Sequence, residues 1–134
     1  MSLPEKKHIL IVDDESSLRA LLGEEFTDRG WDVSEARSGL EGLEIARATS
    51  FDVVLSDIVM PGGNGIELVM TLRSIDPRRP LLFLYSGFDG GAAPESKRLG
   101  VTVFAKPFAL DRVADAIEAA HAEACAAAET DKGS

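Results

Sequence analysis

Short apolar runs alternate with longer amphipathic segments along this chain, and polar residues gather where the apolar runs end. Several of these runs are almost continuously apolar, which is typical of strands that are buried on both faces of a parallel sheet. Between the runs, apolar residues recur every three or four positions, as in helices that cover a sheet. We therefore expect strands at residues 8–12, 31–36, 53–57, 81–85 and 101–105.

The amphipathic segments predict five helices, one after each strand. Apolar residues from Leu18 to Phe26 recur at helical spacing, and Gly30 ends this first helix. Ser38 and Glu41 have the spacing of a capping box at the start of the second helix. A third helix is expected to start at Asn64, and a short fourth helix is expected to end near Leu99 and Gly100. The fifth helix is expected to carry Leu110, Val113, Ala114 and Ile117 on one face.

Five alternating strand and helix units indicate an α/β fold, with a parallel sheet between helix layers. A chain of 134 residues corresponds to one domain. We expect this domain to occupy residues 7–121. Residues 1–6 are expected to form an N-terminal extension of the kind that an expression tag leaves, and residues 122–134 an alanine-rich helical extension with a frayed polar tail.

The charge balance excludes two classes of partner. Lys and Arg number 14 and Asp and Glu number 23, which gives a formal net charge of −9. Nucleic-acid binding normally requires a basic patch, and docking on anionic membranes requires clustered cations. No apolar run reaches the length of a membrane span.

The single cysteine, Cys125, cannot form an intrachain disulfide, which favours a reducing compartment, and we expect a cytoplasmic protein.

Chemically active side chains follow four of the predicted strands. Asp13 and Asp14 follow the first strand, Asp57 ends the third, Ser86 follows the fourth and Lys106 follows the fifth. In an open parallel sheet, sites form at the carboxyl ends of the strands, so these residues should converge on one edge.

The converging groups suit a divalent cation and a phosphoryl group. Three ionised carboxylates need a compensating cation, and oxygen ligands completed by water suit Mg²⁺. A divalent cation, the ammonium of Lys106 and the hydroxyl of Ser86 are the groups that stabilise a transferring phosphoryl. Asp57 is the carboxylate placed to act as the nucleophile.

Four motifs in this order resemble the receiver domain of two-component response regulators, over almost the whole chain. They are Val12-Asp13-Asp14, Asp57 followed by Met60-Pro61-Gly62, Ser86-Gly87, and Lys106-Pro107-Phe108. The resemblance implies a flavodoxin-like, doubly wound sheet of strand order 2-1-3-4-5 with five helices. It implies Mg²⁺ ligation by Asp13, Asp14, Asp57 and the carbonyl of Val59, phosphorylation of Asp57, and contacts of Ser86 and Lys106 to the phosphoryl group. It also implies a cis peptide between Lys106 and Pro107.

The sequence departs from the family pattern at the aromatic switch residue. The family usually places an aromatic three positions before the lysine, where this chain has Val103, and the aromatic Phe104 comes one place later. Because a shift of one residue turns a strand side chain to the other face, Phe104 is interpreted as a core residue as readily as a switch.

The leading hypothesis is a signalling phospho-acceptor that takes a phosphoryl group from a sensor histidine kinase or a histidine phosphotransfer protein. It would assist its own phosphorylation and dephosphorylation without turning over a separate substrate. The resemblance places its output surface, and a candidate homodimer surface, on the fourth helix, fifth strand and fifth helix.

Two alternative functions remain. One is a receiver-like binding module that does not switch, which Val103 suggests. The other is an aspartyl-phosphate phosphatase, which is disfavoured because Val59 stands where such enzymes have a second aspartate. We expect no DNA-binding output in this chain, which is either a single-domain regulator or a piece of a larger regulator or hybrid kinase.

Overall fold

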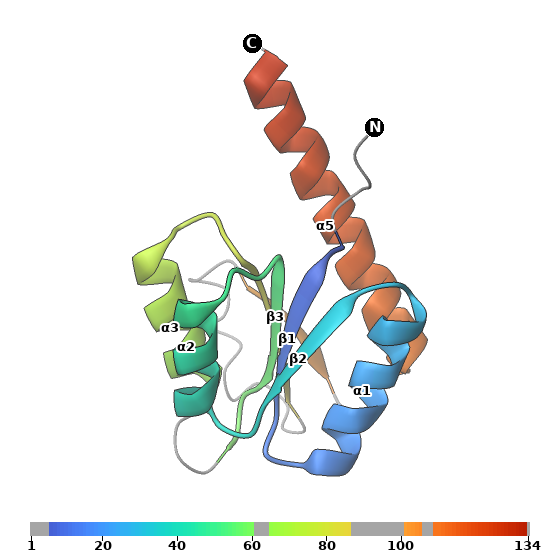
Figure 1. Ribbon diagram of the computed structural model, residues 1–134, viewed down its shortest axis with the longest axis vertical. Helices are drawn as coiled ribbons and strands as arrows, with labels where there is room; N and C mark the ends of the chain where they lie inside the picture. Colours follow the sequence, from blue (N-terminus) through green and yellow to red (C-terminus); the bar gives the residue numbers. More distant parts are fainter. Residues whose placement is uncertain (1–5, 61–64, 87–100, 106–108, 134) are drawn as a thin grey trace.

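The computed structural model describes residues 6–60, 65–86, 101–105 and 109–133. In these parts of the chain, five strands form one parallel sheet in the order β2-β1-β3-β4-β5, flanked by four helices (Figure 1). The strands are β1 (His8–Val12), β2 (Asp32–Ala36), β3 (Val53–Asp57), β4 (Leu81–Ser86) and β5 (Thr102–Ala105). The helices are α1 (Ser16–Asp28), α2 (Gly39–Ala48), α3 (Gly65–Ile75) and α5 (Leu110–Gly133).

This topology confirms the predicted doubly wound α/β fold and its strand order. Each strand lies within one residue of its expected bounds. The short helix expected to end near Gly100 falls in residues 87–100, and Asn64 falls in residues 61–64. Both segments lie outside the described residues.

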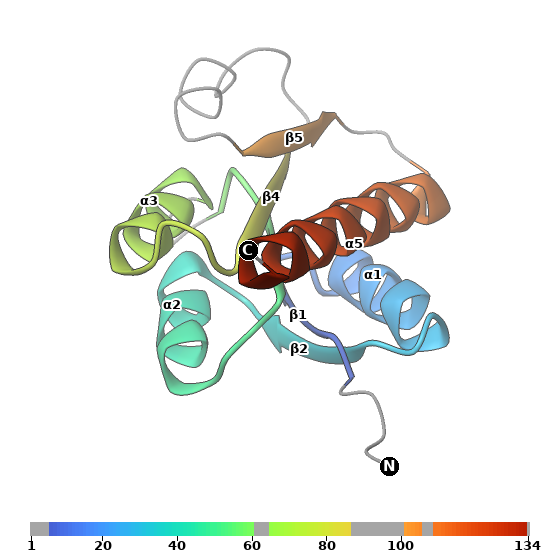
Figure 2. The same ribbon diagram turned by 90° about the horizontal axis from the view of Figure 1, so that it is seen from above.

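Two apolar clusters, one on each face of the sheet, explain the nearly continuous apolar strands. Helices α1 and α5 cover one face and helices α2 and α3 cover the other (Figure 2). Successive residues of β1 alternate between the clusters: Ile9 and Ile11 join the α1/α5 side, and Leu10 and Val12 join the α2/α3 side. All four are fully buried, and burying an aliphatic side chain of this size contributes about 1.5–3 kcal/mol relative to leaving it exposed.

Helix ends follow the expected local signals. The Oγ of Ser38 accepts a hydrogen bond of 3.1 Å from the backbone N–H of Glu41, while the Glu41 carboxylate accepts one of 3.0 Å from the N–H of Arg37. The predicted start of α2 is therefore confirmed. After α1, Gly30 adopts a φ of 90°, which L side chains rarely reach, and so it turns the chain into β2.

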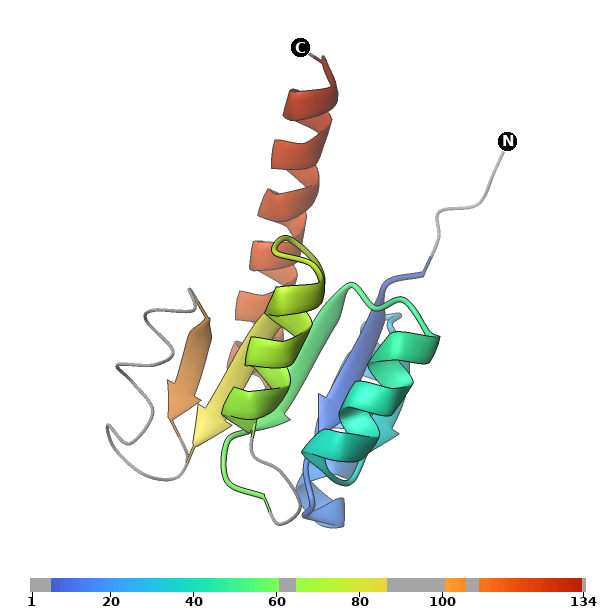
Figure 3. The same cartoon turned by 90° about the vertical axis from the view of Figure 1, so that its left-hand side faces the viewer.

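All five strands run in the same direction, so their carboxyl ends share one edge of the sheet (Figure 3). This is the edge where Asp13 follows β1, and where Asp57 and Ser86 end their strands. At the opposite end, α5 extends well beyond the sheet (Figure 1). No helix in the described part of the chain is both long and apolar enough to cross a membrane.

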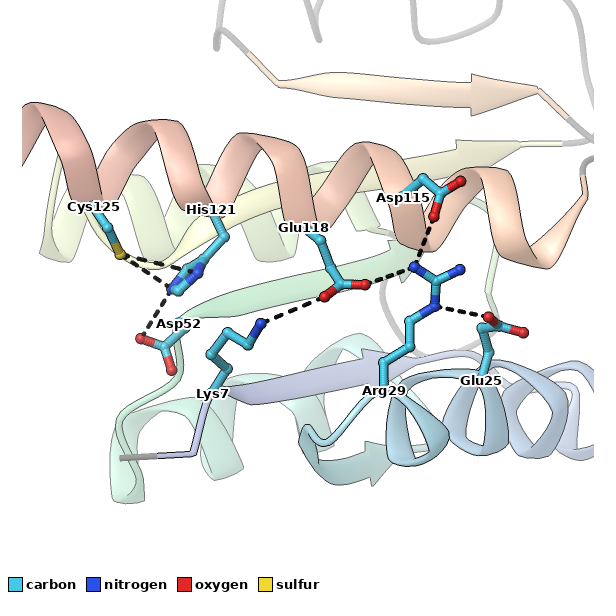
Figure 4. Close-up of polar contacts among 8 residues, drawn as sticks. All are labelled: Lys7, Glu25, Arg29, Asp52, Asp115, Glu118, His121 and Cys125. Atoms are coloured by element: carbon cyan, nitrogen blue, oxygen red, sulfur yellow. Dashed lines mark hydrogen bonds and ion pairs between the residues drawn. The ribbon is translucent and has the colours of Figure 1, made fainter. Parts of the chain in front are cut away.

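A cluster of charged side chains joins α5 to α1 and to the start of β1 (Figure 4). Arg29 donates hydrogen bonds to Glu25 at 2.8 Å, to Asp115 at 2.8 Å and to Glu118 at 2.6 Å. Lys7 donates to the other carboxylate oxygen of Glu118 at 3.4 Å. The hydrogen bonds to these carboxylates, led by Glu118, raise the pKa of Arg29 above its ordinary value. One guanidinium therefore balances three of the protein's many carboxylates.

The cluster continues along α5 to His121. The Nε2 of His121 lies 3.7 Å from Asp52, which directly precedes β3, and 3.7 Å from the Sγ of Cys125 (Figure 4). Its ring packs edge-on against Trp31, with 5.5 Å between centroids. His121 is thus a packing and docking residue of α5.

This geometry predicts a pH-dependent contribution of Glu118 to stability. The hydrogen bond from Arg29 holds the pKa of Glu118 below its ordinary value of 4.5. A carboxylate whose pKa is lowered by folding contributes stability above its unfolded pKa, and this contribution is lost as the pH falls through the folded value. Glu118→Gln should therefore lower the free energy of unfolding at about pH 7, and the gap to the wild type should narrow as the pH falls below the ordinary carboxyl pKa of 4.5.

Urea unfolding followed by circular dichroism across this pH range measures the gap. Glu24→Gln, at an exposed position of α1, is the matched control and should follow the wild type at every pH. A gap of constant size between wild type and Glu118→Gln down to about pH 3 would contradict the ion-pair explanation.

Candidate functional site

Asp13 is a fully buried carboxylate that is held from several sides directly after β1. Its backbone N–H donates to the carbonyl of Ala36 at 3.1 Å, and its own carbonyl accepts from Arg19 at 2.6 Å. The carboxylate Oδ1 accepts the backbone N–H of Glu15 at 2.8 Å, and Oδ2 accepts the hydroxyl of Tyr85 at 2.5 Å. Burial of an ionised group is costly without such donors, so the surroundings of Asp13 are built for a charged side chain.

Asp57 is the second buried carboxylate, 7% exposed, at the last position of β3. Its Oδ1 accepts the backbone N–H of Val59 at 3.3 Å, and its carbonyl accepts the hydroxyl of Ser56 at 2.8 Å. Helix α3 begins at Gly65, immediately against the main chain of Asp57: a Cβ on Gly65 would overlap the Asp57 carbonyl oxygen. The lack of a side chain at Gly65 is therefore what allows α3 to start so close to this carboxylate.

The structure brings together the three carboxylates that the sequence predicted. Asp13, Asp14 and Asp57 each offer one oxygen, and these oxygens lie within 4.8 Å of one another. Asp14 is exposed, whereas the other two are buried. Exposed acidic residues often gather without any ligand, but two buried carboxylates this close need a compensating positive charge. An all-oxygen set with one side open to solvent fits Mg²⁺, which keeps several of its waters.

The other predicted site residues lie at the same edge or outside the described residues. Ser86 ends β4 and is 9% exposed, and its register partner on β5 is Ala105. The side chain of Val59 is 56% exposed, beside Asp57. Lys106 and Pro107 fall in residues 106–108, outside the described part, so their contacts and the expected cis peptide stay predictions.

Val103 and Phe104 lie on opposite faces of the sheet, as their adjacent positions in β5 require. Val103 packs against the α2/α3 cluster, opposite Leu84 in register. Phe104 packs in the α1/α5 cluster, where its ring stacks on Phe83 with centroids 6.0 Å apart. Phe104 is therefore a half-buried residue that packs against the α1/α5 cluster, on the face away from Val103.

Tyr85 is the site residue that sequence reasoning missed. It lies within β4, is fully buried, and donates its hydroxyl to Asp13. Burial, and next the hydrogen bond to Asp13, raise the pKa of Tyr85 far above its ordinary value, so the phenol remains a neutral donor. The available signal was a polar atom within an otherwise apolar strand, because a buried hydroxyl needs a partner.

The fold agrees with comparisons to known proteins. The family model of the response regulator receiver domain matches residues 9–118. The sporulation initiation phosphotransferase F of Bacillus subtilis is 38% identical over 111 residues, which cover 82% of this chain and 90% of that protein. The chain belongs to the response regulator receiver domain family. Other relatives are longer: it spans 46% of a response regulator receiver protein of Anaeromyxobacter, with which it shares 37% identity over 110 residues, or 81% of this chain.

Solved structures support the same assignment. A receiver domain protein of Methanospirillum hungatei superposes with a TM-score of 0.84 at 24% identity, covering 90% of this chain and 97% of that one, which shows the fold. The response regulator TrrA of Thermotoga maritima superposes with a TM-score of 0.77 at 28% identity, covering 84% of this chain and 96% of that one. That protein was crystallised in complex with Mg²⁺ and BeF.

The close approach at Gly65 generates a test of how the site is supported. Gly65→Ala should destabilise the protein by about 1–3 kcal/mol, because the new methyl group must displace the main chain of Asp57. Gly23→Ala, within helix α1, is the control. Its new Cβ would meet the side chain of Val33 at an ordinary 3.6 Å, and the substitution should stabilise the protein by about 0.5–1 kcal/mol. Chemical unfolding measures both. A Gly65→Ala variant that is as stable as Gly23→Ala would show that α3 tolerates a side chain at its start.

Proposed function

We propose that this receiver domain accepts a phosphoryl group on Asp57, in a two-component phosphorelay and with the help of Mg²⁺. The observation that carries the proposal is the convergence of Asp13, Asp14 and Asp57 within 4.8 Å, with two of these carboxylates buried at the carboxyl edge of the sheet. Family membership supports it, as does a 38% identical relative that is named a phosphotransferase.

In the proposed reaction, a carboxylate oxygen of Asp57 attacks the phosphorus of a phosphohistidine on a partner protein. The new bond joins this oxygen to phosphorus, and the phosphorus–nitrogen bond breaks. The electron pair stays on the imidazole of the donor, which takes up a proton from water, and an acyl phosphate remains on Asp57. Bound Mg²⁺ would offset negative charge on the phosphoryl oxygens.

During that step, residues of this chain are proposed to hold the cation and the phosphoryl group in place and to balance their charges. Asp13, Asp14 and Asp57, with the carbonyl of Val59, are the proposed ligands of the cation. Ser86 and Lys106 are proposed to donate to the phosphoryl oxygens. Buried carboxylates that are already held by hydrogen bonds need little rearrangement when the cation binds, which supports a preorganised site.

We assign the chain a signalling role, with no separate substrate to turn over. The proposed donors are a sensor histidine kinase or a histidine phosphotransfer protein, and the proposed location is the cytoplasm. Residues 7–121 are the proposed receiver unit and residues 122–134 its extension. The proposed output and homodimer surface comprises the expected fourth helix, β5 and α5. A phosphorylated Asp57 carries more negative charge and bulk than a carboxylate, which would shift the population of this surface between two states.

Phosphorylation chemistry tests the proposal directly. Incubation with acetyl phosphate and Mg²⁺ should add one phosphoryl group to the folded protein, detected by intact-protein mass spectrometry. Asp57→Asn should remove the adduct because the nucleophilic oxygen is lost, and chelation of Mg²⁺ should strongly reduce it.

The control variant is Asp28→Asn, which removes an exposed carboxylate at the end of α1 and should behave as the wild type. A folded wild-type protein that gains no adduct, or an adduct that persists in Asp57→Asn, would overturn the assignment of the phospho-acceptor.

A second measurement separates a switching domain from a receiver-like module that only binds. The observation that favours the second function is Val103, whose small side chain stands at the position of the aromatic switch. If the protein switches, beryllofluoride with Mg²⁺ should shift the amide NMR signals along β5, away from the immediate surroundings of Asp57. Shifts confined to the residues next to Asp13, Asp14 and Asp57 would favour the binding module.

A further inference from the structure

Tyr85 connects two strands that are not neighbours in the sheet. It lies on β4, in register with Asp57 of β3, while β3 separates β4 from β1. Its hydroxyl nevertheless reaches the carboxylate of Asp13, directly after β1. It is the only tyrosine in the chain, and both its ring and its partner are fully buried.

The hydrogen bonds on Asp13 restrain both of its carboxylate oxygens. Tyr85 donates to Oδ2, and the backbone N–H of Glu15 donates to Oδ1. A carboxylate offers about four lone-pair positions, so these two bonds fix its plane and leave acceptor capacity on each oxygen. The main chain at Glu15 supplies its donor whatever the side chain, whereas the donor to Oδ2 exists only because residue 85 is a tyrosine.

The electrostatic surroundings give this hydroxyl a defined role. Asp13 stands within 4.8 Å of the oxygens of Asp14 and Asp57, so repulsion acts to turn the three carboxylates away from one another. A buried, neutral phenol cannot leave for solvent, and it holds Oδ2 in place against that repulsion. Partners of this kind behind a metal ligand typically change metal affinity by about 10–100-fold.

We propose that Tyr85 is a positioning residue, whose hydroxyl holds the Asp13 carboxylate in the orientation that binds the divalent cation. This inference rests on the proposed function, because it assumes that Asp13 is a cation ligand. It extends that function by assigning part of the cation affinity to a side chain on β4, the strand that ends at Ser86. Cation binding and the strand end proposed to contact the phosphoryl group would therefore share one structural element.

The first test is the Mg²⁺ affinity of Tyr85→Phe, which removes the hydroxyl and keeps the ring in its cluster. Isothermal titration calorimetry should show Mg²⁺ binding at least about tenfold weaker than in the wild type. Phe83→Leu is the matched control, because Phe83 lies on the same strand and in the same cluster as Tyr85. It should lower the unfolding midpoint while leaving the Mg²⁺ affinity within about twofold of the wild type.

The second test needs no substitution at Tyr85. Incorporation of fluorotyrosine labels this position alone, since the chain has one tyrosine. Mg²⁺ should shift the fluorine NMR signal in the wild type, and Asp13→Asn should abolish the shift. A purely structural role would leave the signal unchanged by Mg²⁺.

The outcomes distinguish this inference from the function on which it rests. If the wild type binds Mg²⁺ and forms the Asp57 adduct, while folded Tyr85→Phe binds Mg²⁺ as tightly as the wild type, only the role of Tyr85 is overturned. An unchanged fluorine signal at saturating Mg²⁺ overturns it as well. If the wild type binds no Mg²⁺, both the metal site and the role of Tyr85 are overturned.

Discussion

Repulsion among carboxylates at the carboxyl edge of the sheet is the constraint around which the site is arranged. Asp13 and Asp57 are buried near one another and near Asp14, and each buried carboxylate accepts hydrogen bonds from the surrounding chain. Those donors come from the turn after β1, from β4 and from the turn after β3. The donors meet the carboxylates only while the sheet holds these strands in register. The two apolar clusters keep the strands in register, so the buried charge of the site depends on the packing of the core.

Much of the fold was predictable because its signals are local. The strands β1, β3 and β4 are apolar at most positions, and the cap formed by Ser38 and Glu41 lies within four residues. The positions of Asp13, Asp14 and Asp57 also followed from local reasoning, because the carboxyl ends of parallel strands meet at one edge. The same reasoning placed the hydroxyl of Ser86 and the ammonium of Lys106 at that edge as phosphoryl-stabilising groups, and the family resemblance then implied their direct contacts to the phosphoryl group.

The missed features are long-range pairs. The hydroxyl of Tyr85 meets a carboxylate 72 positions earlier in the chain, and Arg29 reaches Glu118 across 89 positions. No periodicity reports such contacts, and charged residues on a helix are ordinarily solvated. The exact docking of α5 on α1 therefore emerged only from the three-dimensional arrangement. The position of the aromatic at Val103 and Phe104 is a different case. Alternation along a strand already predicts that these neighbours face opposite sides, and the structure shows which side each of them takes.

The missing side chain at Gly65 has a mechanical consequence. Since α3 begins against the carbonyl of Asp57, main chain rests on main chain with no flexible side chain between them. A displacement of the Asp57 backbone would therefore push on the first turn of α3 without slack. The first turn of α3 therefore lies in direct contact with the strand that carries Asp57, and also beside Leu84 of β4.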